Sequence, residues 1–172
     1  MENLRLEFPN ISHKQAYSDM LSEWKGSGEF EAGHVSPWAL FRGNTFEEFL
    51  EIAQNDLTEN HRWVPATLFF LMHGTKILGG IQLRHHIDHP NLRESGWYIG
   101  YGIRPSERRK WYATKMLHLI LIEWRKLWLN QVMLGCYDDN IGSIKTIEKN
   151  GGIFERYTNH EWGLSRVYWI QL

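Results

Sequence analysis

The chain has 172 residues and a formal net charge of −1, a balance that argues against nucleic acid or an acidic membrane surface as its partner. Its single cysteine, Cys136, excludes an internal disulfide framework and fits a reducing compartment. No apolar run approaches the roughly 20 residues of a membrane-spanning helix, and the first residues lack the apolar stretch of a secretion signal. We therefore expect one cytoplasmic domain over residues 1–172, present as a monomer or homodimer.

The first third of the chain predicts a strand and two helices. Apolar and polar residues alternate over 4–8, as in a half-buried strand, and apolar residues recur at helical spacing from Ser12 to Trp24. Residues 25–37 contain three glycines and predict a long loop, which we expect to line a site. Thr45 and Glu48 are spaced as a capping box and predict a helix over 46–55.

The middle of the chain predicts three strands and a long helix. Apolar runs at 64–72 and 76–87 flank the short connection His73-Gly74-Thr75, which predicts a hairpin. A polar loop at 88–95 precedes a third strand at 97–103. Apolar residues at helical spacing then predict a helix that extends to about Trp128.

The last part predicts a strand at 131–137 and a short helix that begins at Asp138-Asp139-Asn140 and stops at Asn150-Gly151-Gly152. A hairpin of strands at 154–162 and 166–172 around Gly163 ends the chain. The fold class is therefore α+β (an α/β three-layer arrangement), with a mixed central sheet of about seven strands and about four helices.

The junction between the strand at 97–103 and the long helix carries the strongest chemical signal. Pro105 marks a turn, and the cations Arg108, Arg109 and Lys110 follow it in what we expect to be the first helical turn. A helix start has unpaired N–H groups and a partial positive charge, so cations there are unfavourable unless an anion binds. The junction thus predicts a phosphate ligand.

Two motifs in this sequence are specific enough to compare with known families. The first is Arg108-Arg109-Lys110-Trp111-Tyr112-Ala113, preceded by Ile103-Arg104-Pro105. The second is Asp139-Asn140-x-x-Ser143-x-x-x-Ile147-Glu148-Lys149-Asn150-Gly151. Both resemble motifs of the GCN5-related N-acetyltransferase family: the first matches the first and last positions of its pyrophosphate-binding signature, and the second resembles its asparagine-led helix before the last hairpin. The resemblance covers most of the chain and is clearest from Thr67 to Glu155.

The resemblance implies that acetyl-CoA is the co-substrate. Its pyrophosphate would bind at the helix start and its pantetheine arm along the strand 97–104, with a backbone N–H near Ile103 facing the thioester oxygen. The thioester would lie where this strand and the one at 132–137 splay apart. The implied acetyl-CoA-binding residues are Ile103, Arg104, Arg108, Arg109, Lys110, Trp111, Tyr112, Ala113, Thr114, Asn140 and Ser143.

The implied reaction is direct attack on the thioester by a primary amine of a small molecule or peptide, in a ternary complex. Glu94 is the candidate base that deprotonates the acceptor, with Asp88 as a second candidate. Ile147 stands where many family members carry a proton-donating tyrosine, so Tyr137, Cys136 or solvent would have to act instead; we favour Tyr137. Cys136 on an apolar strand is typical of an inert buried thiol rather than a nucleophile.

Trp111 departs from the family pattern, because glycine is expected there to let the backbone approach the phosphates. Trp97 and Trp128 also stand where glycine is expected, so either these positions have been altered from glycine or the protein packs indole rings there. Trp111 and Ile147 leave open an alternative, a non-catalytic domain of the same fold that binds a ligand or partner with impaired CoA binding. A third alternative is a longer acyl-CoA.

Other charged residues give weaker signals. Glu29 and Glu31 in the glycine-containing loop are candidates to bind a cationic acceptor. The spacing His85-His86-x-x-His89 falls on a strand end and loop, where adjacent side chains face opposite ways, so we expect no metal site. Gly100-x-Gly102 lacks the third glycine of a dinucleotide fingerprint.

Overall fold

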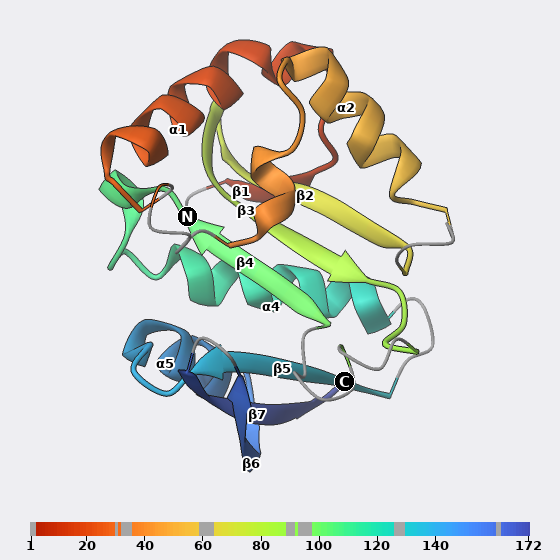
Figure 1. Ribbon diagram of the computed structural model, residues 1–172, viewed down its shortest axis with the longest axis vertical. Coiled ribbons are helices and arrows are strands. Elements are labelled where there is room, and N and C mark those ends of the chain that lie inside the picture. The colour runs from red at the N-terminus through yellow and green to blue at the C-terminus, as the bar shows by residue number, and fades with distance from the viewer. Residues whose placement is uncertain are drawn as a thin grey trace.

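The computed structural model describes residues 3–29, 31, 36–58, 64–88, 92, 98–125, 130–160 and 163–172 (Figure 1). Its helices and strands are, in chain order, β1 (Leu4–Glu7), α1 (Lys14–Gly26), α2 (Phe46–Asn55), β2 (Ala66–His73), β3 (Lys76–Arg84), β4 (Ile99–Ile103), α4 (Tyr112–Arg125), β5 (Gln131–Tyr137), α5 (Ile141–Lys149), β6 (Ile153–His160) and β7 (Gly163–Gln171). Short 3-10 turns are η1 (Ile11–His13), η2 (Trp38–Phe41) and η3 (Pro105–Glu107). The predicted α+β class and element order are confirmed.

Hydrogen bonds from side chains close in sequence determine where α2 begins. The Thr45 hydroxyl accepts a hydrogen bond from the Glu48 N–H at 3.1 Å, as predicted for the N-cap. The Glu48 carboxylate accepts instead from the Asn44 N–H at 2.7 Å, so the predicted reciprocal bond to the Thr45 N–H is replaced by one to the preceding residue. Both side chains thus still accept backbone N–H groups at the start of the helix.

β1 to β4 form an antiparallel sheet in the order β1-β2-β3-β4. A tight connection joins β2 to β3, with His73 opposite Lys76. Gly102 in β4 is required by a close approach, because a Cβ there would lie 2.0 Å from the Ser36 carbonyl oxygen. The backbone at Ser36 therefore packs directly on β4.

β5, β6 and β7 form a second antiparallel sheet in the order β5-β7-β6. The last hairpin differs from prediction, because Gly163 opens β7 and pairs with His160 rather than forming the centre of the turn. Its φ of +131° is the backbone conformation that glycine adopts readily at such a position.

The two sheets are not joined by strand pairing between β4 and β5. Figure 1 shows these strands running in the same direction and diverging toward their C-terminal ends, where the end of α1, the segment before α4, and α5 also gather. The predicted splay between the strand before the long helix and the strand after it is therefore present. It leaves one edge of β4 without a neighbouring strand in the described residues.

Two clusters of buried side chains hold these layers together. α1, α2 and η2 pack on one face of the first sheet, with Met20, Trp24 and Phe70 among their fully buried members. α4 packs on the other face and also contributes to a cluster that includes β5, β7 and Ile147. Burial of large apolar side chains is the main favourable contribution to this arrangement. No helix in the described ranges is long and apolar enough to cross a membrane.

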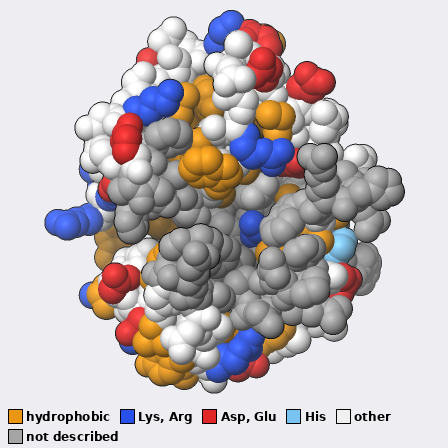
Figure 2. Space-filling view, viewed as in Figure 1, with side chains coloured by type: hydrophobic (Ala, Val, Ile, Leu, Met, Phe, Trp, Pro, Cys, Tyr) orange, Lys and Arg blue, Asp and Glu red, His pale blue; other side chains and the backbone are white. Residues whose placement is uncertain are grey.

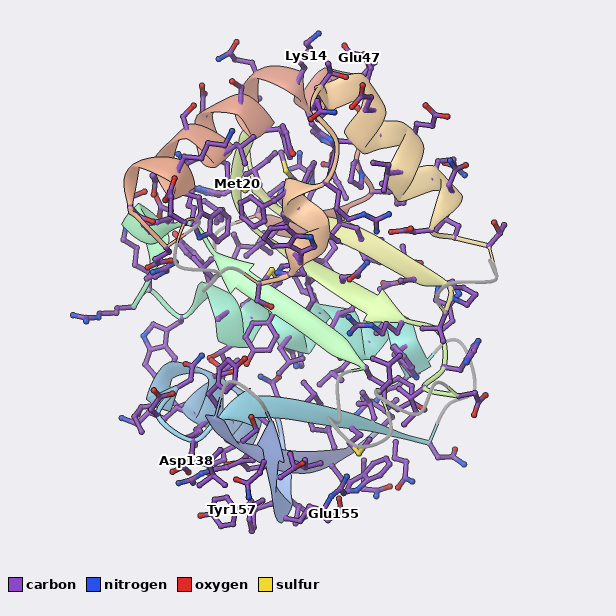
Figure 3. The ribbon with its side chains drawn as sticks, viewed as in Figure 1. Lys14, Met20, Glu47, Asp138, Glu155 and Tyr157 are labelled. Atoms are coloured by element: carbon purple, nitrogen blue, oxygen red, sulfur yellow. The ribbon has the colours of Figure 1, made fainter. Side chains whose placement is uncertain are left out.

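Figures 2 and 3 show the side chains on the face of the molecule formed by α1, α2 and η2. The Lys14 ammonium donates to the Glu47 carboxylate at 2.6 Å, which ties the start of α1 to the start of α2 (Figure 3). Met20 points inward between α1 and the sheet. Figure 2 shows hydrophobic side chains gathered over η2, where Trp38 is 57% exposed.

Candidate active site

A cavity of about 890 Å³ lies between the divergent ends of the two sheets. Its walls come from the end of α1 and the residues after it, the end of β4, the segment 107–111, the start of α4, and α5. This volume is typical of small-molecule and cofactor sites. Segments far apart in the sequence thus converge on one pocket.

The start of α4 supplies hydrogen-bond donors to the cavity. The Trp111 carbonyl accepts the first intrahelical bond, from the Lys115 N–H at 3.0 Å. Helix geometry then leaves the N–H groups of Tyr112, Ala113 and Thr114 without an intrahelical partner, and all three residues line the cavity. Such N–H groups, together with the helix dipole, favour a bound anion.

The cations before α4 are not in its first turn, which corrects the expectation from sequence. η3 winds residues 105–107 separately, and positive φ angles of 61° at Arg109 and 68° at Trp111 prevent regular helix until Tyr112. Arg108 and Arg109 line the cavity from this extended turn. They therefore lie beside the helix start and do not oppose its dipole from within it.

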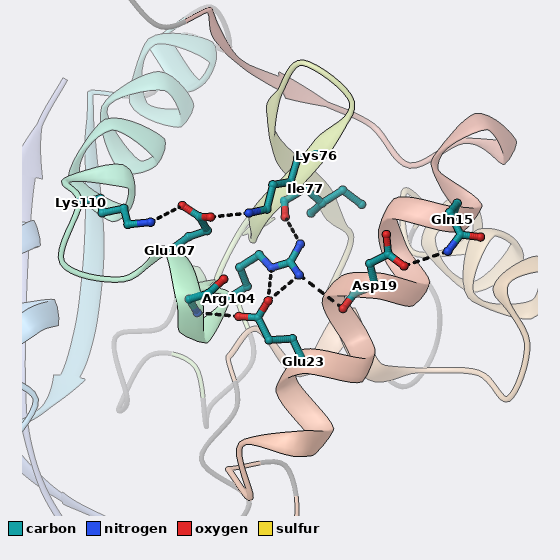
Figure 4. A network of polar contacts seen from close by, with 9 residues as sticks. Gln15, Asp19, Glu23, Lys76, Ile77, Arg104, Glu107 and Lys110 are labelled. Carbon is teal, nitrogen blue, oxygen red and sulfur yellow. Dashed lines mark hydrogen bonds and ion pairs between the residues drawn. The ribbon is translucent and has the colours of Figure 1, made fainter.

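Arg104 and Lys110 are not among the residues that line the cavity. Arg104, 7% exposed, donates from Nε to Glu23 at 2.7 Å and from Nη1 to the Ile77 carbonyl at 3.2 Å (Figure 4). Lys110 pairs with Glu107, which also bonds Lys76. Both cations are directed to carboxylates of the protein rather than into the pocket.

The backbone of β4 turns Ile103 toward the split between the sheets. The Arg84 N–H donates to the Tyr98 carbonyl and the Arg104 N–H to the Leu78 carbonyl, so the even-numbered residues of this strand face β3. Backbone groups alternate along an antiparallel strand, which directs the N–H and carbonyl of Ile103 to the opposite edge. Arg108 Nε donates to this carbonyl at 3.0 Å.

α5 closes the other side of the cavity. Asn140 caps the helix by accepting from the Ser143 N–H at 3.0 Å, and both residues line the cavity. The Ser143 hydroxyl lies 2.6 Å from the Tyr101 hydroxyl of β4. Burial raises the pKa of Tyr101 well above its ordinary value, so this hydroxyl stays protonated in the neutral range.

Sequence reasoning missed two cavity-lining cations on α5, Lys145 and Lys149. They are four residues apart and therefore share one face of the helix, a spacing that could have identified them. With Arg109 they form a cationic group at the pocket, and within the described part of the chain neither Arg109 nor Lys145 has a carboxylate partner. A group of this kind favours a ligand with several negative charges.

Trp111 contacts Lys149, one member of this cationic group. Its side chain is 67% exposed, and the Lys149 ammonium sits 3.5 Å from the centre of its ring. A cation over an indole face is an attractive contact that holds the ring in place. The φ of 68° is a conformation that costs a side-chain-bearing residue free energy and that glycine adopts freely.

Of the two predicted proton-transfer residues, only Tyr137 belongs to the described part of the chain. Tyr137 is half-buried at the end of β5 and does not line the cavity, while Glu94 lies outside the described residues, as do Trp97 and Trp128. Burial raises the pKa of the Cys136 thiol to about 11, which fits the expected inert thiol. Ile147 is fully buried in the core.

The histidines near the end of β3 serve local contacts. The His85 ring lies 2.8 Å from the Thr67 hydroxyl, and His86 pairs with Asp88 at 3.4 Å. His89 lies outside the described residues. In the part of the chain that the structure describes, no group of three acidic, histidine or cysteine side chains is arranged to hold a metal ion.

Comparison with known proteins gives one family match and a set of similar structures. Residues 3–153 match the family described as acetyltransferase (GNAT) domain. RimL, a ribosomal L7/L12 alpha-N-protein acetyltransferase in complex with coenzyme A, superposes with a TM-score of 0.72 at 16% identity, covering 98% of this chain and 94% of that one. A search of curated protein sequences found no match.

Two further solved structures share the fold at similarly low identity. The microcin C7 self-immunity acetyltransferase MccE, in complex with acetyl-CoA and AMP, gives a TM-score of 0.67 at 19% identity, covering 98% of this chain and 92% of that chain. The spermidine/spermine N-acetyltransferase SpeG from Vibrio cholerae gives 0.64 at 15% identity, covering 98% and 95%. At these identities the likeness establishes the fold and leaves the acceptor open.

Proposed function

The chain belongs to the GNAT acetyltransferase family, and on that premise we propose that it transfers the acetyl group of acetyl-CoA to a primary amine of a small molecule or peptide. The observation that carries this proposal is the start of α4, where three N–H groups without intrahelical partners line a cavity that also holds Arg109, Lys145 and Lys149. This combination suits the phosphates of a coenzyme A.

Each part of the cavity has a proposed task. The N–H groups of residues 112–114 bind the pyrophosphate, with Arg109, Lys145 and Lys149 adding positive charge near the phosphates. The unpaired edge of β4 binds the pantetheine arm through backbone hydrogen bonds. The Ile103 N–H, which faces that edge, stabilises the negative charge that develops on the thioester oxygen. Asn140 and Ser143 contact the arm from α5.

The reaction proposed is a direct transfer in a ternary complex. A neutral amine nitrogen attacks the thioester carbon, the C–N bond forms, and the C–S bond breaks. The sulfur leaves as a thiolate, and the proton that the nitrogen loses balances this charge, so that the products are a neutral amide and a free thiol. A thiolate is a fair leaving group, because free thiols have a pKa of roughly 8.5. Because the enzyme holds both substrates together, their proximity contributes much of the rate.

Several expectations from sequence stay predictions. Glu94 is the predicted base and Tyr137 the predicted acid. A single domain over 1–172, a monomeric or homodimeric state and a cytoplasmic location are predicted as well.

The test is an assay of free thiol released from acetyl-CoA in the presence of a panel of primary amines, including peptides with a free N-terminus. The proposal predicts amine-dependent thiol release and a product heavier by one acetyl group. Release of thiol without any acetylated amine, or no release with any amine, would contradict it.

Trp111 is the specific observation that favours a second candidate, a non-catalytic domain of the same fold with impaired CoA binding. Its exposed indole lies against Lys149 at the wall where phosphates would bind. This candidate predicts that coenzyme A does not bind even at millimolar concentration, whereas the acetyltransferase requires binding. Calorimetry with acetyl-CoA separates the two.

A further inference from the structure

The last peptide group of β4, which joins Ile103 to Arg104, is held by hydrogen bonds at both edges of the strand. On one edge the Arg104 N–H donates to the Leu78 carbonyl of β3 at 2.9 Å. On the other, the Ile103 carbonyl accepts a hydrogen bond from Arg108 Nε at 3.0 Å. No strand pairs with β4 on this second edge in the described residues, so the Arg108 side chain supplies the bond that a neighbouring strand would otherwise make.

The other donors of Arg108 are also directed to the protein. Both Nη atoms donate to the carboxylate of Glu29, which follows α1, and the Nη2 contact is 2.6 Å. All three nitrogens of the guanidinium therefore donate within the fold. Arg109 lines the same cavity but has no carboxylate partner within the described part of the chain. The two neighbouring arginines thus differ, because the charge of Arg108 is already paired while that of Arg109 can meet an anion.

The bond from Arg108 lies beside the group that is proposed to contact the reacting oxygen. The Ile103 N–H and carbonyl face the same edge of β4, and this N–H is the proposed donor to the thioester oxygen. A donor stabilises developing negative charge best when its direction is fixed before the reaction. The Ile103 carbonyl oxygen carries a partial negative charge on that edge, which opposes negative charge on the thioester oxygen. A guanidinium bound to this carbonyl holds the end of the strand and offsets the repulsion.

We propose that Arg108 is a positioning residue: by holding the Ile103 carbonyl, it fixes the end of β4 so that the Ile103 N–H faces the thioester oxygen, and it does not bind the phosphates of coenzyme A. This inference rests on the proposed acetyltransferase function. It gives Arg108 a task different from the acetyl-CoA binding that the motif implies. The benefit of the bond appears when charge develops on the oxygen, so Arg108 contributes to the rate of transfer rather than to the affinity for coenzyme A.

Kinetics and calorimetry separate these two tasks. Arg108→Met keeps an apolar stem and removes the guanidinium. It should lower kcat in the thiol-release assay by roughly tenfold to a hundredfold, the loss that a slightly misplaced group causes, and leave the Kd of coenzyme A unchanged. Arg109→Met should instead raise the Kd of coenzyme A by roughly tenfold, because a charge-assisted contact with phosphate is lost. A raised Kd with an unchanged kcat in Arg108→Met would assign Arg108 to the phosphates and overturn the inference.

A spectroscopic measurement reports the hydrogen bond itself. Ile103–Arg104 is the only isoleucine–arginine pair in the sequence. Labelling the isoleucine carbonyl carbons and the arginine amide nitrogens with NMR-active isotopes therefore gives a single signal in a spectrum that correlates each amide with the preceding carbonyl. Loss of a hydrogen bond moves a carbonyl carbon signal upfield, so Arg108→Met should move this signal upfield. An unmoved signal would show that Arg108 does not hold the Ile103 carbonyl.

Arg42→Met is the matched control. Arg42 also donates to a carboxylate through two nitrogens, at 2.5 and 3.1 Å from the Asp56 oxygens, and does not line the cavity. Its side chain is 36% exposed, against 39% for Arg108. Arg42→Met should leave kcat, the Kd of coenzyme A and the carbonyl signal unchanged. An equal fall in kcat in both variants would show that loss of any such ion pair slows the reaction, and would overturn the inference.

The outcomes separate this inference from the function on which it rests. If the unaltered protein acetylates no amine, the proposed acetyltransferase function fails. If amines are acetylated, but Arg108→Met keeps its full kcat or loses affinity for coenzyme A, the role of Arg108 alone is overturned.

Discussion

The hydroxyl oxygens of Tyr101 on β4 and Ser143 on α5 lie 2.6 Å apart, in a hydrogen bond that crosses the split between the two sheets. β4 and β5 share no strand pairing there, so this contact is one of the polar ties across the cavity. Tyr101, Ile103 and Ser143 all line the cavity. The bond therefore joins two walls of the pocket, β4 and α5.

Removing either hydroxyl should lower stability by a small, equal amount. A hydrogen bond between neutral groups contributes about 1 kcal/mol net, so Tyr101→Phe and Ser143→Ala should each lower the free energy of unfolding by about that much. The double variant should cost little more than either alone, which urea denaturation of all four proteins measures. Additive losses would show that the two hydroxyls act independently.

The buried guanidinium of Arg104 should matter far more to stability than the exposed cations beside it. Arg104→Met leaves Glu23 with the Ser106 N–H but without its cationic partner, and the Ile77 carbonyl without its side-chain donor, a loss of about 3 kcal/mol. Lys110→Met removes a half-exposed cation from Glu107, which keeps its bond to Lys76, and should cost less than about 1 kcal/mol. Equal losses in urea denaturation would contradict the assignment of Arg104 as a buried structural tie.

Stability should fall when the pH drops below about 4.5. The hydrogen bond from Lys76 lowers the pKa of Glu107 in the folded protein from its ordinary value of 4.5. A carboxyl with a lower pKa when folded contributes stability that is present above the unfolded pKa and is lost as the pH falls through the folded pKa. Glu107→Gln should therefore show a shallower decline in unfolding free energy between pH 5 and pH 3, measured by urea denaturation. An unchanged slope would contradict this contribution.

Replacing Trp111 separates the effect of its ring from the effect of its backbone. Trp111→Gly should raise stability by about 1 kcal/mol by relieving the positive φ, and should tighten acetyl-CoA binding by uncovering the start of α4. Trp111→Ala removes the indole but keeps a Cβ at the same φ, so it should tighten binding without gaining stability. If neither variant binds acetyl-CoA more tightly, the indole is not the obstruction.

The elements that the sequence predicts well are those with local signals. α2 has a cap and an apolar stripe, and β5 has a continuous apolar run bounded by polar residues, so both are found at their predicted residues. The turn before α4 is different, because the positive φ angles of Arg109 and Trp111 have no signal in their side chains. The charges and the spacing of apolar residues alone predict helix there.

The site residues divide in the same way. The positions of Asn140 and Ser143 in the site could be predicted, because both belong to one short motif in which Asn140 caps the helix that contains Ser143. The partners of Arg104 and Arg108 lie 81 and 79 residues away, and which carboxylate each cation meets depends on how α1 packs against β4. The only sequence signal for Lys145 and Lys149 is their spacing of four residues on a helix. Many lysines on exposed helix faces have this spacing without binding a ligand, so the spacing alone does not predict a site.

Calorimetric titration with acetyl-CoA tests the central claim most directly, because the cavity is proposed to bind the phosphates of that molecule before any chemistry occurs. The account predicts saturable binding with a Kd in the micromolar range for the unaltered protein, and a lower Kd for Trp111→Gly. The absence of binding at millimolar acetyl-CoA in both proteins would contradict it.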